Sequence, residues 1–411
     1  MRILVTSQHF HPETFRINDV VAELHRAGHA VTVLTGQPNY PEGRIYPGYR
    51  ATSAGEDRSM PYEIFRVPVV PRGSGSALRL LSEYLSFICS AALCGAWLLR
   101  GRRYDVVFCY GTSPIFQALP AWWLSRLKLA PLVTWVQDLW PESLSVTGYV
   151  QGSRKLRAVG VAVSWLYRRH DLLLLQSEGF FDAVRERAGR TPLAFHPNPG
   201  ESAPKGDLPP DLPMIKGNFR VVFAGNLGKA QALSTILAAA VQLQPCRPDI
   251  HISIIGSGQS SSWLKSEIER LGLRNVDTLG RFPAAAMPWF FEQSDALLLT
   301  LAKDPVVSMT LPSKLQSYLA AARPIIGALD GEGSRLIREN AVGLCGPAED
   351  VQALCANLEA LADMSASERA AAGTRARAVY DRTYAPEHLT PRLVALFQRT
   401  IDRRATKSVP T

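Results

Sequence analysis

Short apolar runs alternate with longer segments of helical periodicity along the first half of the chain. The runs predict β-strands, and several contain no polar position, which is typical of parallel strands buried on both faces. In the longer segments apolar residues recur every three or four positions, which predicts helices. The expected strands are Arg2–Ser7, His29–Thr35, Ile64–Val69, Asp105–Tyr110, Leu132–Gln137 and Asp171–Gln176, and the expected helices are Ile17–Ala27, Leu78–Leu99, Pro114–Leu127, Arg154–Arg169 and Glu178–Ala188.

The same alternation restarts in the second half, after a stretch that interrupts it. Residues 197–217 are rich in proline and glycine and have no periodicity, which indicates a linker. The strands expected after it are Arg220–Ala224, His251–Ile255, Val276–Leu279, Ala296–Leu301, Pro324–Ala328 and Gly343–Cys345. Helices are expected to begin near Ala230, Gln259, Ala284, Pro312, Ser334 and Val351, and two more cover Ser367–Arg382 and Pro386–Arg403.

This pattern predicts an α/β protein with two doubly wound, Rossmann-like domains in tandem. We expect an N-terminal domain at 1–197, a linker at 198–217 and a second domain at 218–384. A helix at 385–403 and a tail at 404–411 complete the chain of 411 residues. Doubly wound sheets bind ligands beyond the carboxyl ends of their strands, so a site is expected in a cleft that both domains face.

Composition and charge narrow the classes of protein. The hydrophobic fraction of 46% indicates a globular protein, and six scattered cysteines without a Cys-x-x-Cys pair indicate thiols in a reducing compartment. Residues 1–198 hold 22 Lys and Arg against 15 Asp and Glu, which favours anionic partners such as nucleic acid or an anionic membrane, or simply a solvated surface. The uncharged stretch Tyr84–Leu99 is shorter than the roughly 20 residues of a spanning helix. A buried core helix is the favoured interpretation, with membrane docking as the alternative.

The most specific local motif is the glycine turn that follows the strand at 220–224. Gly225, Asn226, Leu227 and Gly228 lead through Lys229 into a helix, so backbone amides and a positive side chain surround one point, as a phosphate requires. A plain strand-to-helix connection is the alternative. In the second motif, Pro312 suits the first turn of a helix and leaves the amides of Ser313, Lys314 and Leu315 free. The two helix starts together predict a diphosphate clamp.

Polar side chains also follow other expected strands. Glu13, Arg16 and Asn18 lie at the first strand-to-helix junction, Asn39 and Tyr40 follow the second strand, and Gln137, Asp138 and Glu142 follow the fifth. Helix capping or a surface turn is the alternative role for these residues. Glu332 lies in a loop after a strand of the second half, where it can accept hydrogen bonds from ribose or sugar hydroxyls.

These blocks together resemble the family 4 glycosyltransferases of the GT-B type. The resemblance rests on GNLGKAQ with LPSKLQSYLAAARPIIG in the second half, and on HFHPETFRINDVVAELHRAGHAVTVLTGQPNYPEG and WVQDLWPESL in the first. It covers nearly the whole chain and is most similar to the WcaI/WbuB-like group of colanic acid and O-antigen assembly. It implies a C-terminal helix that returns to the first domain, a donor side in the second domain and an acceptor side in the first.

The resemblance implies roles for matching residues. Lys229 matches the basic residue that holds the donor diphosphate, whereas Asn226 or Leu227 stands where the family often has an arginine. The family's E-x7-E pair falls at Met309 and Ser317, neither of which is acidic, so Glu332 is the hypothesis for the ribose contact. Gln137 stands where many members have a histidine. Asp138, Glu13 and Lys229 are the catalytic candidates, and Asp138 and Glu13 are not ranked as a base.

The implied reaction moves a sugar such as L-fucose or N-acetyl-L-fucosamine from a nucleotide-diphosphate donor to a polyprenyl-diphosphate-linked glycan, with retention and without cofactor or metal. The sequence lacks Asp-x-Asp, a complete P-loop, GxSxG and GxGxxG. It also lacks an RNA-binding aromatic motif, so nucleic acid is not expected as a partner. The expected location is the cytoplasm, at the inner membrane surface. A GT-B nucleotide-sugar epimerase and a non-enzymatic two-domain sugar- or nucleotide-binding protein are the alternatives.

Overall fold

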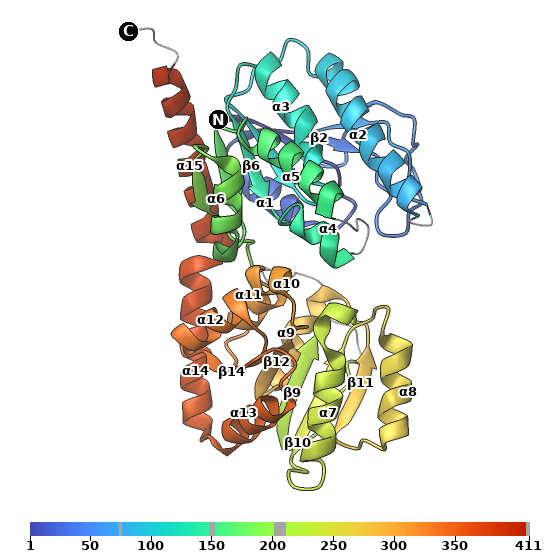
Figure 1. Ribbon diagram of the computed structural model, residues 1–411, viewed down its shortest axis with the longest axis vertical. Coiled ribbons are helices and arrows are strands. Elements are labelled where there is room, and N and C mark those ends of the chain that lie inside the picture. Colours follow the sequence, from blue (N-terminus) through green and yellow to red (C-terminus); the bar gives the residue numbers. More distant parts are fainter. Residues whose placement is uncertain (74–75, 148–152, 201–210, 408–411) are drawn as a thin grey trace. The chain divides into compact units, whose positions relative to one another are not determined.

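The computed structural model describes residues 1–73, 76–147, 153–200 and 211–407 of the chain (Figure 1). It divides into two compact units, of which unit 1 comprises Met1–Asn198 with Leu389–Thr411 and unit 2 comprises Pro199–His388. Each unit is built on one sheet whose strands are parallel, apart from the short β3 in unit 1. The expected α/β class with two doubly wound domains is confirmed.

Unit 1 contains an eight-stranded sheet in the order β3-β4-β2-β1-β5-β6-β7-β8. Its strands are β1 (Arg2–Ser7), β2 (Ala30–Gly36), β3 (Gly55–Asp57), β4 (Glu63–Val67), β5 (Val106–Gly111), β6 (Leu132–Val136), β7 (Leu172–Leu175) and β8 (Leu193–Phe195). Its helices are α1 (Arg16–Arg26), α2 (Ala77–Leu98), α3 (Ala118–Leu127), α4 (Glu142–Thr147), α5 (Ser153–Tyr167), α6 (Phe181–Ala188) and, from Leu389 on, α15 (Pro386–Lys407).

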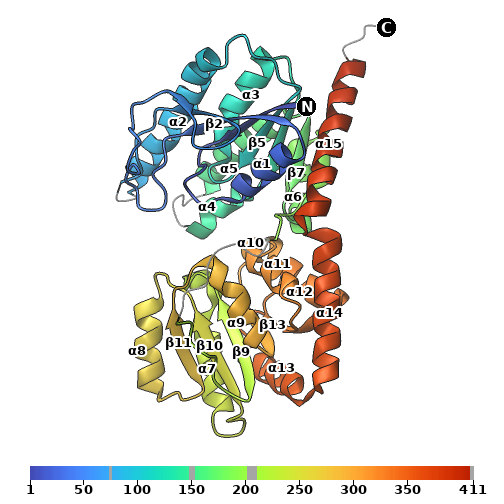
Figure 2. The same cartoon turned by 180° about the vertical axis from the view of Figure 1, so that it is seen from behind.

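Two hydrophobic clusters cover the two faces of this sheet. On one face α1 and α15 pack against the strands, with Phe397 of α15 in edge contact with Phe108 of β5 at 5.1 Å between ring centroids. On the other face lie α2, α3 and α5 (Figures 1 and 2). The C-terminal helix therefore joins unit 1, as expected. It continues to Lys407, beyond the expected end at Arg403, and the remainder of the expected tail lies outside the described residues.

Unit 2 contains a six-stranded parallel sheet in the order β11-β10-β9-β12-β13-β14. Its strands are β9 (Phe219–Ala224), β10 (Ile250–Ile255), β11 (Val276–Gly280), β12 (Ala296–Thr300), β13 (Ile325–Ala328) and β14 (Gly343–Gly346). Its helices are α7 (Leu233–Leu243), α8 (Ser261–Leu271), α9 (Met287–Gln293), α10 (Pro305–Met309), α11 (Ser313–Ala320), α12 (Gly331–Glu339), α13 (Val351–Asp363) and α14 (Ala366–Thr383).

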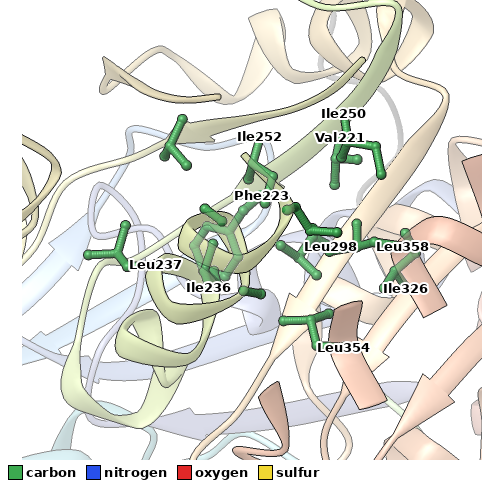
Figure 3. Packing of buried hydrophobic residues seen from close by; sticks show 14 of the residues in the cluster. Val221, Phe223, Ile236, Leu237, Ile250, Ile252, Leu298, Ile326, Leu354 and Leu358 are labelled. Carbon is green, nitrogen blue, oxygen red and sulfur yellow. The ribbon is translucent and has the colours of Figure 1, made fainter. Parts of the chain in front are cut away.

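The core of unit 2 explains why its strands read as continuous apolar runs. Val221, Phe223, Ile252 and Leu298 are fully buried and pack against α7 and α13 on one face (Figure 3). Val222, Leu297 and Leu299 of the same strands belong to a second cluster on the other face, with α11 and α14. Successive side chains point to opposite faces, so both faces must be apolar when helices cover both.

Helix α2 departs from the expectation of a buried core helix. Only Glu83, Phe87, Ala91 and Gly95 are buried among its 22 residues, and they form one stripe at a spacing of four. The exposed apolar side chains are Leu78 (75%), Leu81 (52%), Leu85 (52%), Leu93 (73%) and Trp97 (62%). By length and composition alone α2 is also the one helix among the described residues that qualifies as a membrane span, with a mean hydropathy of 1.4. One stripe suffices to cover the sheet, and the remaining apolar residues face outward.

Candidate functional site

The loop after β9 is held in a conformation that depends on close approach of the backbone. Gly225 has φ +138°, and a Cβ atom there would lie 2.4 Å from Cε of Lys314. A Cβ at Gly258 would lie 2.6 Å from Oδ1 of Asn226. The amide of Leu227 donates to the carbonyl of Ser257 at 3.0 Å, which joins the loops that follow β9 and β10. The loop 225–228 is therefore a shaped turn with Asn226 exposed and Leu227 buried.

Two lysines stand beside this turn in different states. Lys229 begins a short 3-10 turn (Lys229–Gln231), is exposed, and has no hydrogen bond or ion pair through its side chain in the described chain. Lys314, by contrast, is partly buried: its Nζ donates to Oε1 of Gln231 at 2.5 Å and lies 3.8 Å from the ring centre of Phe223. Burial lowers the pKa of Lys314 to about 7.

Helix α11 brings Lys314 to the turn and is itself anchored to the end of β9. The hydroxyl of Tyr318 accepts from the amide of Ala224 at 2.9 Å, and Tyr318 is 1% exposed. At the start of α11 the amide of Leu315 donates to the carbonyl of Pro312 at 2.9 Å. The expectation that this amide is free is therefore wrong. The amides of Ser313 and Lys314 make no hydrogen bond within the described residues. The helix start thus offers two amides rather than three.

Glu332 lies in the first turn of α12, after β13, and not in the turn beside Lys229. Its Oε2 accepts from Nη2 of Arg335 at 2.7 Å, and its side chain is 18% exposed. Among the described residues, no hydrogen bond joins it to residues 225–231 or to α11. Asp330, two residues earlier, accepts from the amide of Ala348 at 3.2 Å and so shapes the connection. Glu332 remains at the carboxyl edge of the sheet, since it follows a parallel strand.

In unit 1, Glu13 is the centre of a closed network. Its carboxylate is 1% exposed and accepts from the amides of Asn39 (2.8 Å), Tyr40 (2.6 Å) and Phe10 (3.1 Å). His9 Nδ1 lies 3.1 Å from Oε1 of the same carboxylate. Glu13 therefore ties the segment after β1 to the segment after β2, and its oxygens are already occupied by protein groups.

The network extends to helix α2 through Glu83 and Arg72, which the sequence pattern did not indicate. His9 Nε2 lies 3.8 Å from Oε1 of Glu83, a buried residue of α2. The other oxygen of Glu83 accepts from Nε of Arg72 at 2.9 Å. The guanidinium of Arg72 also lies 5.0 Å from the ring centre of Tyr40, and its amide donates to Oδ1 of Asn39. Buried charges of this kind have no periodicity that a sequence pattern could reveal.

Asn18 and Arg16 lie at the start of α1. The side chain of Asn18 donates to the carbonyl of Glu13 at 2.7 Å and accepts from the amide of His11 at 3.2 Å, so it fixes the loop before the helix. Arg16 is close enough to Tyr110 of β5 to lower the pKa of that phenol, against the much larger effect of burial, which raises it. The structure thus places Arg16 toward the end of the neighbouring strand.

Asp138 lies after β6 and is less constrained than Glu13. Its Oδ2 accepts from the amide and the hydroxyl of Ser113, both at 2.8 Å, and the same hydroxyl accepts from Nε1 of Trp140 at 3.0 Å. Burial raises the pKa of Asp138, while the hydrogen bonds from Ser113 lower it in part. Oδ1 makes no hydrogen bond within the described chain. One carboxylate oxygen is therefore left for a ligand.

Gln137 and Glu142 lie near Asp138 in the sequence but do not contact the same groups as Asp138. Gln137 is 9% exposed, and its side-chain Nε2 is buried without a hydrogen-bond partner among the described residues. Glu142, the first residue of α4, forms an ion pair with Arg187 of α6 at 2.5 Å. The structure thus brings Glu13, Asn18, Asn39 and Tyr40 together in one network. Asp138 and Glu142 have separate partners.

Two family models account for most of the chain. Residues 14–199 match the glycosyl transferase 4-like domain, and residues 206–379 match the glycosyl transferases group 1. Their order follows that of units 1 and 2. Each unit therefore matches a domain of a sugar-transferring enzyme, and of the strands in the two sheets β1 lies outside the matched residues.

The chain is similar to individual proteins over nearly its full length. It is 23% identical to the colanic acid biosynthesis glycosyl transferase WcaI of Escherichia coli K12, over 87% of this chain and 91% of that protein. Sucrose-phosphate synthase of Thermosynechococcus elongatus shares its fold with a TM-score of 0.73 at 14% identity, covering 98% and 99% of the two chains.

HepE of Anabaena in complex with UDP shares its fold with a TM-score of 0.66 at 16% identity, covering 97% of this chain and 100% of that one. Three observations point to the same family. They are the tandem parallel sheets, the glycine turn beside two lysines, and the two matching domain models. This chain belongs to the GT-B glycosyltransferases of the family 4 type.

Proposed function

We propose that this transferase moves a sugar from a nucleoside diphosphate donor to a hydroxyl of a polyprenyl-diphosphate-linked glycan in exopolysaccharide or O-antigen assembly. L-Fucose and N-acetyl-L-fucosamine are the proposed sugars, and transfer proceeds with retention and without a metal ion or cofactor. The observation that carries the donor class is the pair of lysines beside the 225–228 turn, one of them without a partner in the described chain. HepE, a structural neighbour, binds UDP.

The chemistry that this site must support is departure of a diphosphate, which gains negative charge as the glycosidic bond breaks. Lys229 and Lys314 would place positive charge there, and the amides of Ser313 and Lys314 would donate hydrogen bonds at the positive end of α11. Each charge-assisted hydrogen bond contributes about 1.5–3 kcal/mol. Such fixed donors stabilise the leaving group without a change in the protein at the moment of reaction.

In unit 1 we assign the acceptor side to the residues after β1, β2 and β6. Asp138 has an oxygen without a partner in the described chain and is the candidate for direct contact with a sugar hydroxyl. Glu13, Asn18, Asn39 and Tyr40 would shape this side through their network, with Arg16, Gln137 and Glu142 around it. Glu332, in unit 2, is assigned to the ribose or sugar of the donor.

Two measurements test the donor class and the reaction. Ligand binding to the native state raises the unfolding temperature, so a thermal-shift series with UDP, GDP and other nucleoside diphosphates should identify one preferred nucleotide. The enzyme should then release that nucleoside diphosphate from its sugar donor only when a lipid-linked glycan is present. Conversion of the nucleotide sugar to an isomer without an acceptor would instead make the protein an epimerase.

We also propose that the exposed apolar face of α2 docks on an anionic membrane at the cytoplasmic side of the inner membrane. This face, defined by Leu78, Leu81, Leu85, Leu93 and Trp97, has Arg79 in its first turn and is followed by Arg100 and Arg103. Apolar side chains bordered by arginines fit the boundary between acyl chains and anionic head groups. The burial of only 22% of the most apolar window of α2 supports this assignment.

A flotation assay tests this surface directly. Wild-type protein should float with phosphatidylglycerol vesicles, and the exposed double substitution L85E/L93E should abolish flotation without unfolding the protein. The matched control V241E/W263E changes two exposed apolar residues of unit 2 and should float like wild type. Wild-type protein that stays at the bottom of the gradient would refute the assignment.

A further inference from the structure

A cavity of about 510 Å³ lies in unit 1, and none of the proposed donor or acceptor residues lines it. Its lining comes from three places: the connection from α5 to β7, the connection from α6 to β8, and the last turns of α15. Helices α6 and α15 lie side by side in both views (Figures 1 and 2). A volume of this size is in the range of small-molecule pockets.

The cavity lies at the opposite edge of the sheet from the candidate acceptor residues. The connections that line it lead into β7 and β8, so they lie at the amino ends of these strands. Glu13, Asn39 and Asp138 all follow strands and lie at the carboxyl ends. Because the strands concerned are parallel, the two edges are distinct. The cavity is therefore not an extension of the acceptor side.

Its charge is strongly one-sided. Four arginines line it (Arg168, Arg190, Arg403 and Arg404) against one acidic residue, Asp171, which leaves three net positive charges. The remaining titratable group in the lining, His170, is buried, and burial lowers its pKa to about 4, so it adds no charge near neutral pH. Like charges gathered on a concave surface raise the local concentration of anions.

The side chains of two of these arginines have no partner among the described residues. Arg404 donates to Oδ2 of Asp171 at 3.0 Å and to the carbonyl of Ala130 at 2.9 Å, and Arg168 donates from Nε to the carbonyl of Arg187. The side chains of Arg190 and Arg403 are exposed and make no hydrogen bond or ion pair with any part of the chain that the structure describes. They come from different elements, so stabilisation of one helix end does not explain both.

We propose that this arginine cavity binds a ligand that carries a phosphate or diphosphate group, separately from the donor and acceptor of the transfer reaction. Guanidinium groups form paired hydrogen bonds with phosphate oxygens, and two unpaired arginines on facing elements can grip one group from two sides. A diphosphate matches the three net positive charges. The phosphate source is either a soluble anion or a lipid head group, and both present the same chemistry to the arginines.

Hydrogen–deuterium exchange with inorganic pyrophosphate locates binding without any assumption about turnover. Amides of residues 187–193 and 400–406 should become protected in wild-type protein. The double substitution R190A/R403A should remove this protection and weaken the corresponding affinity at least tenfold. The control R157A/R399A, which removes two exposed arginines of unit 1 outside the cavity lining, should change it less than twofold.

A parallel series with phosphatidylglycerol vesicles distinguishes the two sources. Protection by pyrophosphate identifies a soluble ligand, and protection by vesicles alone identifies a lipid head group; either must be lost in R190A/R403A. Protection confined to residues 225–231, or equal protection in wild type and R190A/R403A, would refute the arginine cavity as a binding site. Neither result bears on the transfer reaction, because no residue of the cavity belongs to the donor or acceptor side.

Discussion

The charged residues at the carboxyl ends of the strands are arranged differently in the two units. In unit 1 the carboxylate of Glu13 already accepts hydrogen bonds from three backbone amides and contacts His9, so its network is closed before any ligand arrives. In unit 2 Lys229 is exposed without a partner in the described chain, and Lys314 has one hydrogen bond. The charge of Glu13 in unit 1 thus stabilises the loops around it, whereas the charge of Lys229 in unit 2 is available for an incoming anion.

This difference separates two kinds of sensitivity to mutation. Loss of a group that completes a closed, buried network leaves other polar groups unsatisfied and lowers stability. Loss of an open charge removes only what the ligand would have gained. Substitutions in the Glu13 network should therefore act mainly on folding, and substitution of Lys229 mainly on binding. The following four predictions test this division, beginning with the largest effect.

Glu13→Gln should lower the free energy of unfolding by about 2–4 kcal/mol, because an amide nitrogen replaces one acceptor oxygen opposite backbone N–H groups. Urea denaturation measures this change. Glu42→Gln, at an exposed position of the same loop region, should stay within about 0.5 kcal/mol of wild type. A stable Glu13→Gln variant with a large loss of kcat would instead make Glu13 a catalytic residue and would break the comparison.

Lys229→Ala should weaken the binding of the preferred nucleoside diphosphate about 10- to 100-fold, which corresponds to about 1.4–2.8 kcal/mol. Stability should not change measurably, since the side chain is exposed and makes no contact that folding needs. Isothermal titration calorimetry measures the affinity, with the exposed Lys265→Ala on α8 as the matched control. An unchanged affinity would remove Lys229 from the donor site.

The sequence predicted the elements of both units well because their signal is local. Strand β1 has the expected bounds, and the helix expected at 78–99 is observed as α2 at 77–98. The short elements β3, β8, α4 and α10 were missed, since three to six residues are too few for a periodic signal. For α2 the sequence favoured a buried core helix over one with an outward apolar face, because apolar composition does not tell which side a sheet will cover.

The candidate site was predictable only as far as chain order determines it. Within each sheet the residues after parallel strands must gather at the carboxyl ends, so Gly225 in unit 2 and Asp138 in unit 1 were identified from their positions. Lys314 was identified from the helix start that Pro312 indicates. The bond from Lys314 to Gln231 joins residues 83 positions apart, and the bonds from Asn39 and Tyr40 to Glu13 are made by backbone amides. Neither set of hydrogen bonds can be predicted from residue types or their spacing.

Lys314→Met should raise stability at pH 7 by about 1–3 kcal/mol while weakening donor binding. Burial lowers the pKa of Lys314 from 10.5 to about 7, so between these values the unfolded chain binds the extra proton. Stability of the wild-type protein therefore rises with pH across this window, and the substitution should flatten that rise. Donor affinity of the wild type should fall above pH 7, as Lys314 loses its charge.

Thermal unfolding as a function of pH, followed with and without the nucleoside diphosphate, measures both effects of Lys314→Met. Lys303→Met, at an exposed lysine of unit 2, is the matched control and should leave the slope of stability against pH unchanged. A wild-type slope that persists in Lys314→Met would mean that another group titrates in this window. In that case unit 2 would hold its charge by a different residue.

Asp138→Asn should have the smallest effect on stability, within about 1 kcal/mol, and it tests a candidate acceptor residue that, like Lys229, has a side-chain atom without a partner in the described chain. Burial raises the pKa of Asp138, so the folded state binds the proton more tightly, and stability falls as pH rises from the unfolded pKa to the folded one. The asparagine removes this cost and keeps an oxygen for Ser113, so the two changes largely offset each other.

The activity of Asp138→Asn tells whether Asp138 contacts the acceptor or, like Glu13, stabilises its own loop. If Oδ1 contacts the acceptor, kcat/KM for the acceptor should fall at least tenfold while donor affinity stays unchanged. The pH dependence set by the carboxylate should also disappear from the rate profile. Ser113→Ala removes one donor to Oδ2 without touching Oδ1, and it should shift the profile rather than abolish it. Equal rates for wild type and Asp138→Asn would place Asp138 with Glu13, as a residue that serves only the structure of its loop.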